Sequence, residues 1–293
     1  MARRVGRTVV APLRGAAAAR PRKRFAQHFL APAWADKVVV AIAPAPGDRF
    51  LEIGPGPGVL TRRLALRARH VTAIEIDRDL AAALRPELPG NVDLVTADIL
   101  GVDLAPILAG GPLRVAGNLP YNISSPILFK LLTAAEKGGQ PPFFANKGDG
   151  LPLIDATLML QREVAERLAA KPGSKDYGVL TIFVGAQADV QLLLSLPPGA
   201  FRPAPKVHSA VVRLRFKPPL VPEPLRQMFG RMVRTMFTQR RKTILNALRP
   251  FADSVGQTSA AALSRAGIDP TRRPETLGIP ELIRLVSAFA PKG

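Results

Sequence analysis

From residue 36 to about residue 135 the sequence alternates short apolar runs with amphipathic stretches, and this alternation constrains the fold more than any other feature. VLTRRLAL and DLAAALRPEL predict helices between the apolar runs. Such βαβ units build a parallel sheet with helices on both faces, so we expect an α/β fold with a Rossmann-like sheet. Ligands bind such sheets where the strands end, which makes the residues after each strand the candidate site. The predicted strands are RFLEIG (49–54), HVTAIEID (70–77), NVDLVTAD (91–98) and LRVAGNLP (113–120).

The second half of the chain has a less regular pattern. GGQPPFFANKGDG (138–150) predicts an exposed loop or insertion. ATLMLQREVAERLAA (156–170) predicts a helix, and YGVLTIFVGAQADVQLLLSL (177–196) predicts further strands. Prolines cluster in PPLVPEP (218–224), which indicates a linker, and the residues beyond it predict helices to the end.

These patterns divide the chain into three parts. We expect the Rossmann-like domain over residues 24–217 and a small all-helical domain over residues 218–293. Residues 1–23 are rich in arginine, and the first acid of the chain is Asp36, so this segment predicts a flexible basic arm. The arm has three interpretations: a tail that touches RNA, an organellar transit peptide, or a solvated extension without a role.

The charge of the chain indicates its partner. It has 41 Lys and Arg against 22 Asp and Glu, a net charge of +19. Such a surface attracts polyanions and gains from counterion release, so nucleic acid is the expected partner. An acidic membrane surface competes with this interpretation, but no strongly amphipathic segment stands alone to favour it. No apolar window is long enough to span a bilayer, so we expect a soluble protein that is not exported.

The chain has no cysteine, which excludes disulfides and thiolate metal sites. Its three histidines, His28, His70 and His208, lie far apart in the sequence and show no metal-ligand spacing. We therefore expect no metal.

A glycine-rich turn follows the first predicted strand. LEIGPGPG (51–58) contains Gly54, Gly56 and Gly58, which allow the backbone to turn tightly against a nucleotide-like cofactor, although a sharp loop alone also uses glycines. Glu75 ends the next strand, where a carboxylate can accept from both hydroxyls of a ribose. Asp98 ends the third strand and can accept from an adenine amino group. Either acid can instead cap a helix.

The glycine spacing discriminates between cofactors. Dehydrogenases use GxGxxG, whereas this chain has GxGxG with Glu52 just before it. The pattern favours S-adenosylmethionine over NAD, because S-adenosylmethionine needs no pyrophosphate cradle. Its cationic sulfonium suits a site of carboxylates and carbonyl oxygens.

With these motifs and the NLPY turn, the sequence resembles the KsgA/RsmA family of rRNA adenine N6 dimethyltransferases, which also contains the Erm resistance enzymes. The resemblance covers nearly the whole chain after residue 22. It implies a Rossmann-like S-adenosylmethionine-dependent methyltransferase sheet and a small all-helical C-terminal domain. The motifs are RFAQHFL (24–30), LEIGPGPGVLT (51–61), AIEID (73–77), ADIL (97–100), GNLPYNISSPIL (117–128), LMLQREVAERL (158–168), FRPAPKVHSAVV (201–212) and FTQRRKTILNAL (237–248).

The resemblance also implies which residues line the cofactor pocket. His28 stands in QHFL where the family more commonly has Asn. A neutral imidazole can still make one hydrogen bond there, and the alternative is a surface histidine on the arm. The implied pocket residues are His28, Leu30, Gly54, Gly56, Glu75, Asp98 and Asn118.

Residues 118–121, the NLPY turn, carry the predicted catalytic groups. The exocyclic amine of adenine is a weak nucleophile, so it must be held in line with the methyl group. The Asn118 side-chain oxygen and, by analogy with other N6-adenine enzymes, the Leu119 carbonyl can accept its two hydrogens. Pro120 fixes φ, and Tyr121 offers a flat face for stacking. A proline turn with a packed tyrosine is the alternative.

Two further segments are predicted to contact RNA. Phe201 is a candidate second stacking face for a flipped base, with a core phenylalanine as the alternative, and Lys206 is a candidate phosphate contact. Beyond them, residues 224–252 contain no acid, and their apolar residues recur at near-helical spacing. A solvated helix face is the alternative to RNA contact there. The cations predicted to touch RNA are Arg240, Arg241 and Lys242.

The resemblance implies dimethylation of two adjacent adenines in the 3′-terminal hairpin of 16S rRNA. The partner is then small-subunit rRNA or an immature small ribosomal subunit, and the enzyme is a cytoplasmic monomer. RRPETL (272–277) continues the bacterial pattern. The alternatives are Erm-like dimethylation of 23S rRNA, a non-catalytic RNA-binding assembly factor on the same fold, and an organellar location if the arm is a transit peptide.

Overall fold

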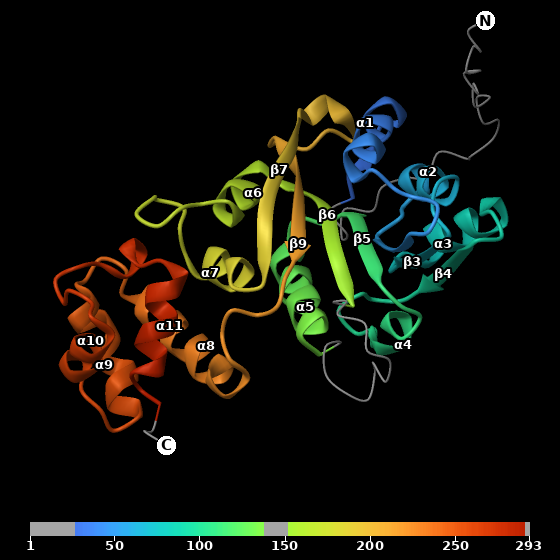
Figure 1. Cartoon of the computed structure of the whole chain (residues 1–293). Coiled ribbons are helices and arrows are strands. Elements are labelled where there is room, and N and C mark those ends of the chain that lie inside the picture. The colour runs from blue at the N-terminus through green and yellow to red at the C-terminus, as the bar shows by residue number, and fades with distance from the viewer. Residues whose placement is uncertain (1–26, 138–151, 291–293) are drawn as a thin grey trace, which may run out of the picture.

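The structure is a computed structural model that describes residues 27–137 and 152–290 (Figure 1). The predicted basic arm (1–23) and the predicted loop (138–150) lie outside the described residues. Among the helices of the described ranges, none is both long enough and apolar enough to cross a membrane.

A seven-stranded sheet in the order β4-β3-β2-β5-β6-β9-β7 forms the centre of the molecule (Figure 1). The four strands predicted from the alternating pattern are its parallel strands β2 to β5, and β6 extends them in parallel. The sheet is nevertheless mixed, because β9 runs antiparallel to both β6 and β7. A short pair, β1 and β8, lies apart from it. The strands are β1 Phe29–Leu30, β2 Arg49–Ile53, β3 His70–Glu75, β4 Val92–Thr96, β5 Leu113–Asn118, β6 Leu153–Gln161, β7 Ala188–Leu196, β8 Phe201–Arg202 and β9 Ser209–Phe216.

Two predictions for the second half of the chain were wrong in part. The helix predicted over 156–170 is the strand β6 followed by a shorter helix, α6 (Arg162–Leu168). β6 lies between β5 and β9 and is buried from residue 155 to residue 160, so Leu158, Met159 and Leu160 follow one another without the alternation of a half-exposed strand. In the segment 177–196 only β7 is a strand, and the residues before it form α7 (Val179–Gly185).

Helices cover both faces of the sheet, as the βαβ pattern predicts. On one face, α1 and α2 pack with Val71 of β3 in one apolar cluster, and α3 packs with Ala73 in another. On the opposite face, α4, α5, α6 and α7 pack around Val115 and Leu158 of the central strands. These three clusters hold the helices against the two faces of the sheet. The helices are α1 Pro32–Ile42, α2 Val59–Ala65, α3 Arg78–Leu84, α4 Ala105–Leu108, α5 Ser124–Lys137, α6 Arg162–Leu168 and α7 Val179–Gly185.

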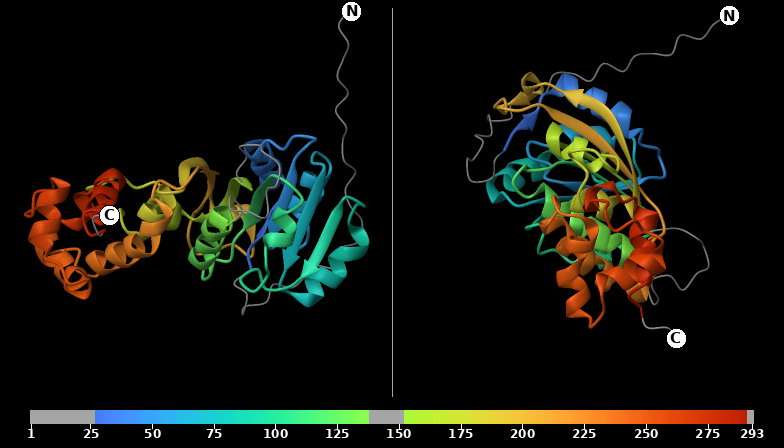
Figure 2. Two further views of the ribbon diagram at one scale, coloured as in Figure 1. Left: turned by 60° about the horizontal axis from the view of Figure 1, so that its bottom comes forward. Right: turned by 90° about the vertical axis from the view of Figure 1, so that its left-hand side faces the viewer.

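The C-terminal residues form helices only, and these gather at one side of the molecule (Figure 2). Their apolar core also takes in Tyr177 and Ile182, which precede the predicted linker. Tyr177 Oη donates a hydrogen bond to Leu277 O at 2.9 Å, and Gly173 N donates to Glu275 O at 2.7 Å. The helical part is therefore packed against the segment around α7. Its helices are α8 Glu223–Thr238, α9 Ile244–Ser254, α10 Ser259–Ala266 and α11 Ile279–Ser287.

Candidate active site

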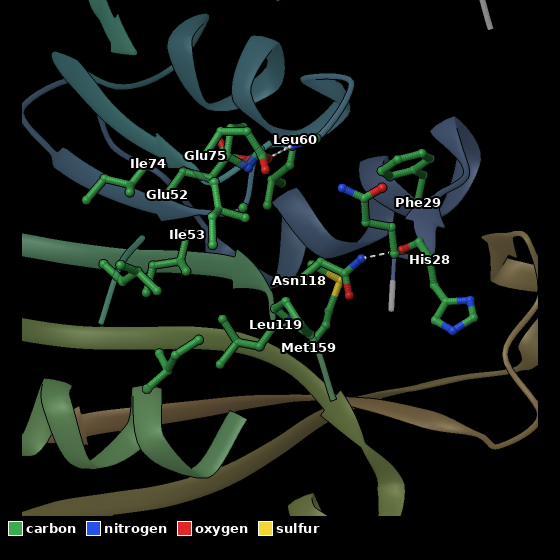
Figure 3. A pocket seen from close by; sticks show the side chains of 18 of the residues that line it. His28, Phe29, Glu52, Ile53, Leu60, Ile74, Glu75, Asn118, Leu119 and Met159 are labelled. Carbon is green, nitrogen blue, oxygen red and sulfur yellow. Dashed lines mark hydrogen bonds between the residues drawn. The ribbon is translucent and has the colours of Figure 1, made fainter. Parts of the chain in front are cut away.

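A pocket opens at the carboxyl ends of β2, β3, β4 and β5 (Figure 3). It is also lined by residues 27–30, which lead into β1, and by Met159 of β6. The structure therefore brings every predicted cofactor and catalytic residue to one cavity, although these residues come from five separate segments. They are His28, Leu30, Gly54, Gly56, Glu75, Asp98, Asn118, Leu119, Pro120 and Tyr121.

The glycine turn connects β2 to α2 with a backbone that only glycine adopts readily. Gly54, Gly56 and Gly58 all have positive φ, at 69°, 54° and 78°. A Cβ on Gly58 would lie 2.4 Å from the Leu84 side chain, and a Cβ on Gly56 would lie 3.2 Å from the Phe29 ring. Side chains at Gly56 and Gly58 would thus be crowded by their neighbours, so glycine at these positions keeps the turn compact beside the pocket.

Glu75 at the end of β3 holds this turn through both of its oxygens. Gly56 N donates to Oε2 at 3.0 Å, and Asp77 N donates to Oε1 at 2.9 Å. Burial raises the pKa of Glu75 above its usual value, while the two backbone donors oppose that shift. Each carboxylate oxygen can accept a further hydrogen bond, so Glu75 can bind a ligand hydroxyl while it supports the turn.

Glu52, one residue before the end of β2, is a pocket residue that the sequence reasoning did not select. Its side chain is only 1% exposed, and within the described ranges nothing bonds to its Oε2. Burial, together with the nearby Glu75, raises the pKa of Glu52 to about 8, and Thr61 opposes the shift. The signal was present, because an acid within an otherwise apolar buried strand needs a partner.

Asp98 lies beyond the end of β4 and is exposed. Its Oδ1 accepts from Leu100 N at 2.9 Å, which stabilises the turn that brings Asp98 to the pocket. It does not cap a helix, because the next helix, α4, begins at Ala105. The acid that does cap a helix is Asp77, which accepts from Asp79 N and Leu80 N at the start of α3.

The pocket lining is acidic although the chain is strongly basic. Glu52, Glu75 and Asp98 line it, and its described lining contains neither lysine nor arginine. The remaining wall is mainly apolar, with isoleucine and leucine from β2, β3 and the turns that follow. Such a cavity favours a ligand that combines a positive charge with a flat apolar group.

The NLPY turn forms the side of the pocket opposite the acids. Asn118 ends β5, and Leu119 N donates to Met159 O at 3.2 Å, so the turn stays attached to β6. Ile123 N donates to Pro120 O at 3.2 Å and closes the turn before α5 begins at Ser124. Figure 3 shows Asn118 between Glu52 and Glu75 on one side and His28 on the other.

The two residues predicted from FRPAPKV lie in different environments. Phe201 is completely buried in the cluster that contains α1, with 0% exposure. A ring without exposed surface cannot stack on a base, so the structure favours the alternative, a core phenylalanine. Lys206 is exposed in the segment that leads to β9 and Ser209.

The predicted RNA-binding cations lie in a turn and not on a helix face. The near-helical spacing spans two helices, and Arg240, Arg241 and Lys242 lie between the end of α8 at Thr238 and the start of α9 at Ile244. Arg240 is half-buried and donates to Ser174 O at 3.0 Å. Arg241 and Lys242 are exposed.

Comparisons with known proteins identify the family of the chain. The ribosomal RNA adenine dimethylase family matches residues 18–289. The chain is 42% identical to a ribosomal RNA small subunit methyltransferase A from Acidithiobacillus ferrooxidans, over 94% of this chain and 96% of the relative. Among solved structures, it is similar to a dimethyladenosine transferase from Plasmodium falciparum, with TM-score 0.71, 25% identity, and coverage of 88% of this chain and 96% of the other. It is also similar to the 23S rRNA methyltransferase ErmE, with TM-score 0.62, 28% identity, and coverage of 89% and 99%.

Proposed function

The chain belongs to the ribosomal RNA adenine dimethylase family, and we propose that it dimethylates N6 of two adjacent adenines near the 3′ end of 16S rRNA. The observation that carries this proposal is the acidic pocket that joins the glycine turn, Glu75 and Asp98 to the NLPY turn. The small-subunit target is supported by the relative from Acidithiobacillus ferrooxidans, which is a small subunit methyltransferase and matches over almost the full length of both chains. The reaction takes place in the cytoplasm, and the enzyme acts as a monomer.

S-adenosylmethionine fits the pocket and would supply an electrophilic methyl group on a cationic sulfur. The orphan oxygen of Glu52 and the absence of basic residues from the described lining suit that positive charge. Glu75 is placed to accept from the ribose hydroxyls, and Asp98 to accept from the adenine amino group. The glycine turn allows the ligand to lie close to the backbone.

The NLPY turn orients the target amine. The Oδ1 atom of Asn118 and the carbonyl of Leu119 accept from the two amine hydrogens, which holds the nitrogen lone pair in line with the methyl group. Asn118 is neutral, and no strong base is needed, because the amine becomes acidic only after it has gained the methyl group. Tyr121 supports the ring of the base by stacking. Most of the rate acceleration then comes from positioning, which supplies up to roughly 7 to 11 kcal/mol in well-oriented reactions.

Exposed cations guide the RNA to this site. Lys206 lies on the segment beside Tyr121 and contacts a phosphate, while Arg241 and Lys242 contact the backbone of the RNA from the helical part. Phe201 is not part of this surface, since it is buried.

The test is mass spectrometry of rRNA adenines after reaction with the protein and S-adenosylmethionine. Undermethylated small subunits and large subunits are used in parallel, with wild type and Asn118→Ala. We expect dimethyladenine in small-subunit rRNA only, and a loss of at least about 100-fold in kcat for Asn118→Ala. RNA affinity of the variant should stay within about twofold, because the cationic surface lies elsewhere.

Three outcomes would overturn the proposal. Methylation of large-subunit rRNA alone would assign the chain to the activity of ErmE, the second similar structure. Wild-type turnover by Asn118→Ala would remove the NLPY turn from the mechanism. RNA binding without methylation of either substrate by the wild type would indicate a non-catalytic assembly factor.

A further inference from the structure

The side chain of Asn118 is held in one orientation by a carbonyl from a distant part of the chain. Asn118 Nδ2 donates to His28 O at 2.6 Å, a contact drawn in Figure 3. A carbonyl oxygen can only accept, so the amide nitrogen must face His28 and Oδ1 must face away from it. Asn118 therefore keeps its oxygen as the atom available to a substrate amine.

The main chain and the ring of His28 are each held by residues 201–203. His28 directly precedes β1, in which Phe29 pairs with Arg202 and Leu30 pairs with Phe201 of β8. The Nδ1 atom of the His28 ring lies 2.8 Å from Pro203 O. Because the carbonyl accepts, Nδ1 carries the hydrogen and the ring has a defined direction.

The same ring lies against Tyr121. The centroids of the two rings are 5.6 Å apart, and their planes differ by 25°. This is an offset-stacked arrangement of the kind that aromatic pairs prefer. His28 thus contacts both functional side chains of the NLPY turn, Asn118 through its main chain and Tyr121 through its imidazole.

Ser209 holds Tyr121 at the other end of the ring. Tyr121 Oη and Ser209 Oγ are 2.6 Å apart, and Ser209 is completely buried. Ser209 begins β9, where it pairs with Gln161 of β6 and Leu196 of β7. A serine fixed between two strands is a rigid anchor, so the hydroxyl of Tyr121 has little freedom.

We propose that His28 and Ser209 are positioning residues for methyl transfer, which fix the Asn118 amide and the Tyr121 ring so that the target amine points at the methyl group. This role rests on the proposed function, and it differs from the cofactor contact that the resemblance implies for His28. The positioning by His28 and Ser209 matters most for the second methyl transfer. A monomethylated amine has only one hydrogen left for two acceptors, so its orientation depends more on how firmly the ring is held.

Two variants remove the same hydrogen bond from opposite ends and form the central test. Ser209→Ala and Tyr121→Phe should each lower kcat about tenfold, with KM for both substrates within about twofold. The double variant should be no slower than the slower single variant, because only one bond is lost. In all three, the ratio of monomethyladenine to dimethyladenine should rise. Additive losses or a wild-type product ratio would overturn the role of Ser209.

The role of the His28 ring is tested with one variant that removes the ring and one that keeps an aromatic ring. His28→Ala should lower kcat about tenfold and raise the monomethyl product, whereas His28→Phe keeps a ring over Tyr121 and should recover part of the activity. Equal activity of His28→Ala and wild type would overturn the role of the ring. Ser195→Ala on exposed β7 and His70→Ala on β3 are matched controls that should leave kcat and product ratio unchanged.

A measurement without catalysis separates this proposal from the proposed function. The chain has only two tyrosines, so ring signals of Tyr121 in a tyrosine-labelled protein can be assigned by NMR with Tyr177→Phe. We expect those signals to shift in His28→Ala and in Ser209→Ala, but not in Ser195→Ala. Unshifted signals in both test variants would overturn the positioning role whether or not the wild type methylates RNA. Absence of wild-type methylation on either subunit would instead overturn the proposed function.

Discussion

The two ends of the central sheet differ in whether their buried charged residues have partners of opposite charge. At the amino end, Arg114 of β5 is only 9% exposed and uses all of its donors. Its guanidinium donates to both oxygens of Asp155 at 3.0 and 2.8 Å and to Asp48 at 2.6 Å. It also donates to the carbonyls of Ile42 and Ala43 at the end of α1. Burial alone would lower the pKa of Arg114, but these acids raise it above its usual value.

At the carboxyl end, buried acids face the pocket without a cation. Burial raises the pKa of both Glu52 and Glu75, and the charge of Glu75 adds to the shift of Glu52. A chain with 41 Lys and Arg had many residues that could have neutralised them. Arg114 and its acids are thus paired within the framework, whereas the buried acids at the carboxyl end have no basic residue beside them in the described pocket lining, as the proposed cationic cofactor would require.

Removal of Arg114 should have the largest effect on stability. Arg114→Ala leaves Asp155 buried with only Arg213, at 3.7 Å, as a nearby cation, so the free energy of unfolding should fall by about 3 to 5 kcal/mol. Urea denaturation measures this change. Arg63→Ala, which removes a partner of the exposed Asp36, is the control and should cost no more than about 1 kcal/mol. Equal losses of unfolding free energy in the two variants would show that the buried Arg114 network stabilises the fold no more than an exposed ion pair does.

The second prediction concerns Glu52 and pH. Its pKa is about 8 in the folded protein, above the ordinary value of 4.5, so the folded state holds this proton more tightly than the unfolded chain does. The corresponding stability is complete below about pH 4.5 and is lost as the pH rises towards 8. Glu52→Gln does not titrate, so between pH 5 and pH 8 it should gain on the order of 3 kcal/mol of unfolding free energy relative to wild type. Denaturation at several pH values checks this, and a difference that is independent of pH would contradict it.

The third prediction separates the two acids of the pocket. Glu75→Gln replaces one acceptor oxygen by an amide group that cannot accept from Gly56 N or Asp77 N. The glycine turn should loosen, and affinity for S-adenosylmethionine should fall by roughly 100-fold, measured by calorimetry. Glu75→Asp is the control that keeps the charge but shortens the reach. An unchanged affinity in Glu75→Gln would show that the turn does not depend on this carboxylate.

Much of this site could be predicted because strand ends converge. Gly54, Glu75, Asp98 and Asn118 each follow or end a strand whose apolar pattern is clear, and parallel strands bring such residues to one edge. Their convergence in one pocket required no knowledge of side-chain packing. The same argument fails beyond Lys137, where β6 is an apolar run without alternation that a helix can produce equally well.

The orientation of Asn118 and the burial of Phe201 depend on contacts between distant segments, which the local sequence does not encode. Asn118 bonds to a main-chain carbonyl 90 positions earlier, and any residue type at position 28 provides such a carbonyl. The burial of Phe201 follows from the pairing of β1 with β8, two strands of two residues each. Neither strand has a pattern long enough to predict.

The contrast between paired and unpaired charges extends to the basic turn between α8 and α9. Arg240 donates to Ser174 O and lies 3.8 Å from Glu275, so it joins this turn to the segment before α7. Arg241 and Lys242 are exposed, and no hydrogen bond joins either side chain to another described residue. Arg240 is therefore part of the framework, whereas Arg241 and Lys242 remain the predicted RNA contacts.

The last prediction, with the smallest expected effect, distinguishes Arg240 from the exposed Arg241 and Lys242. Arg241→Ala combined with Lys242→Ala should weaken RNA binding by about tenfold at low salt, because two phosphate contacts are lost. The slope of log affinity against log salt should become shallower by about 0.7 to 0.9 for each contact. Arg240→Ala should leave that slope unchanged and instead lower the thermal midpoint of unfolding, since its bonds are internal. Filter binding at several salt concentrations measures the slopes. If Arg240→Ala makes the salt slope shallower by as much per residue as the loss of Arg241 and Lys242 does, then Arg240 also contacts RNA. Its hydrogen bond to Ser174 would then not exclude it from the RNA-binding surface.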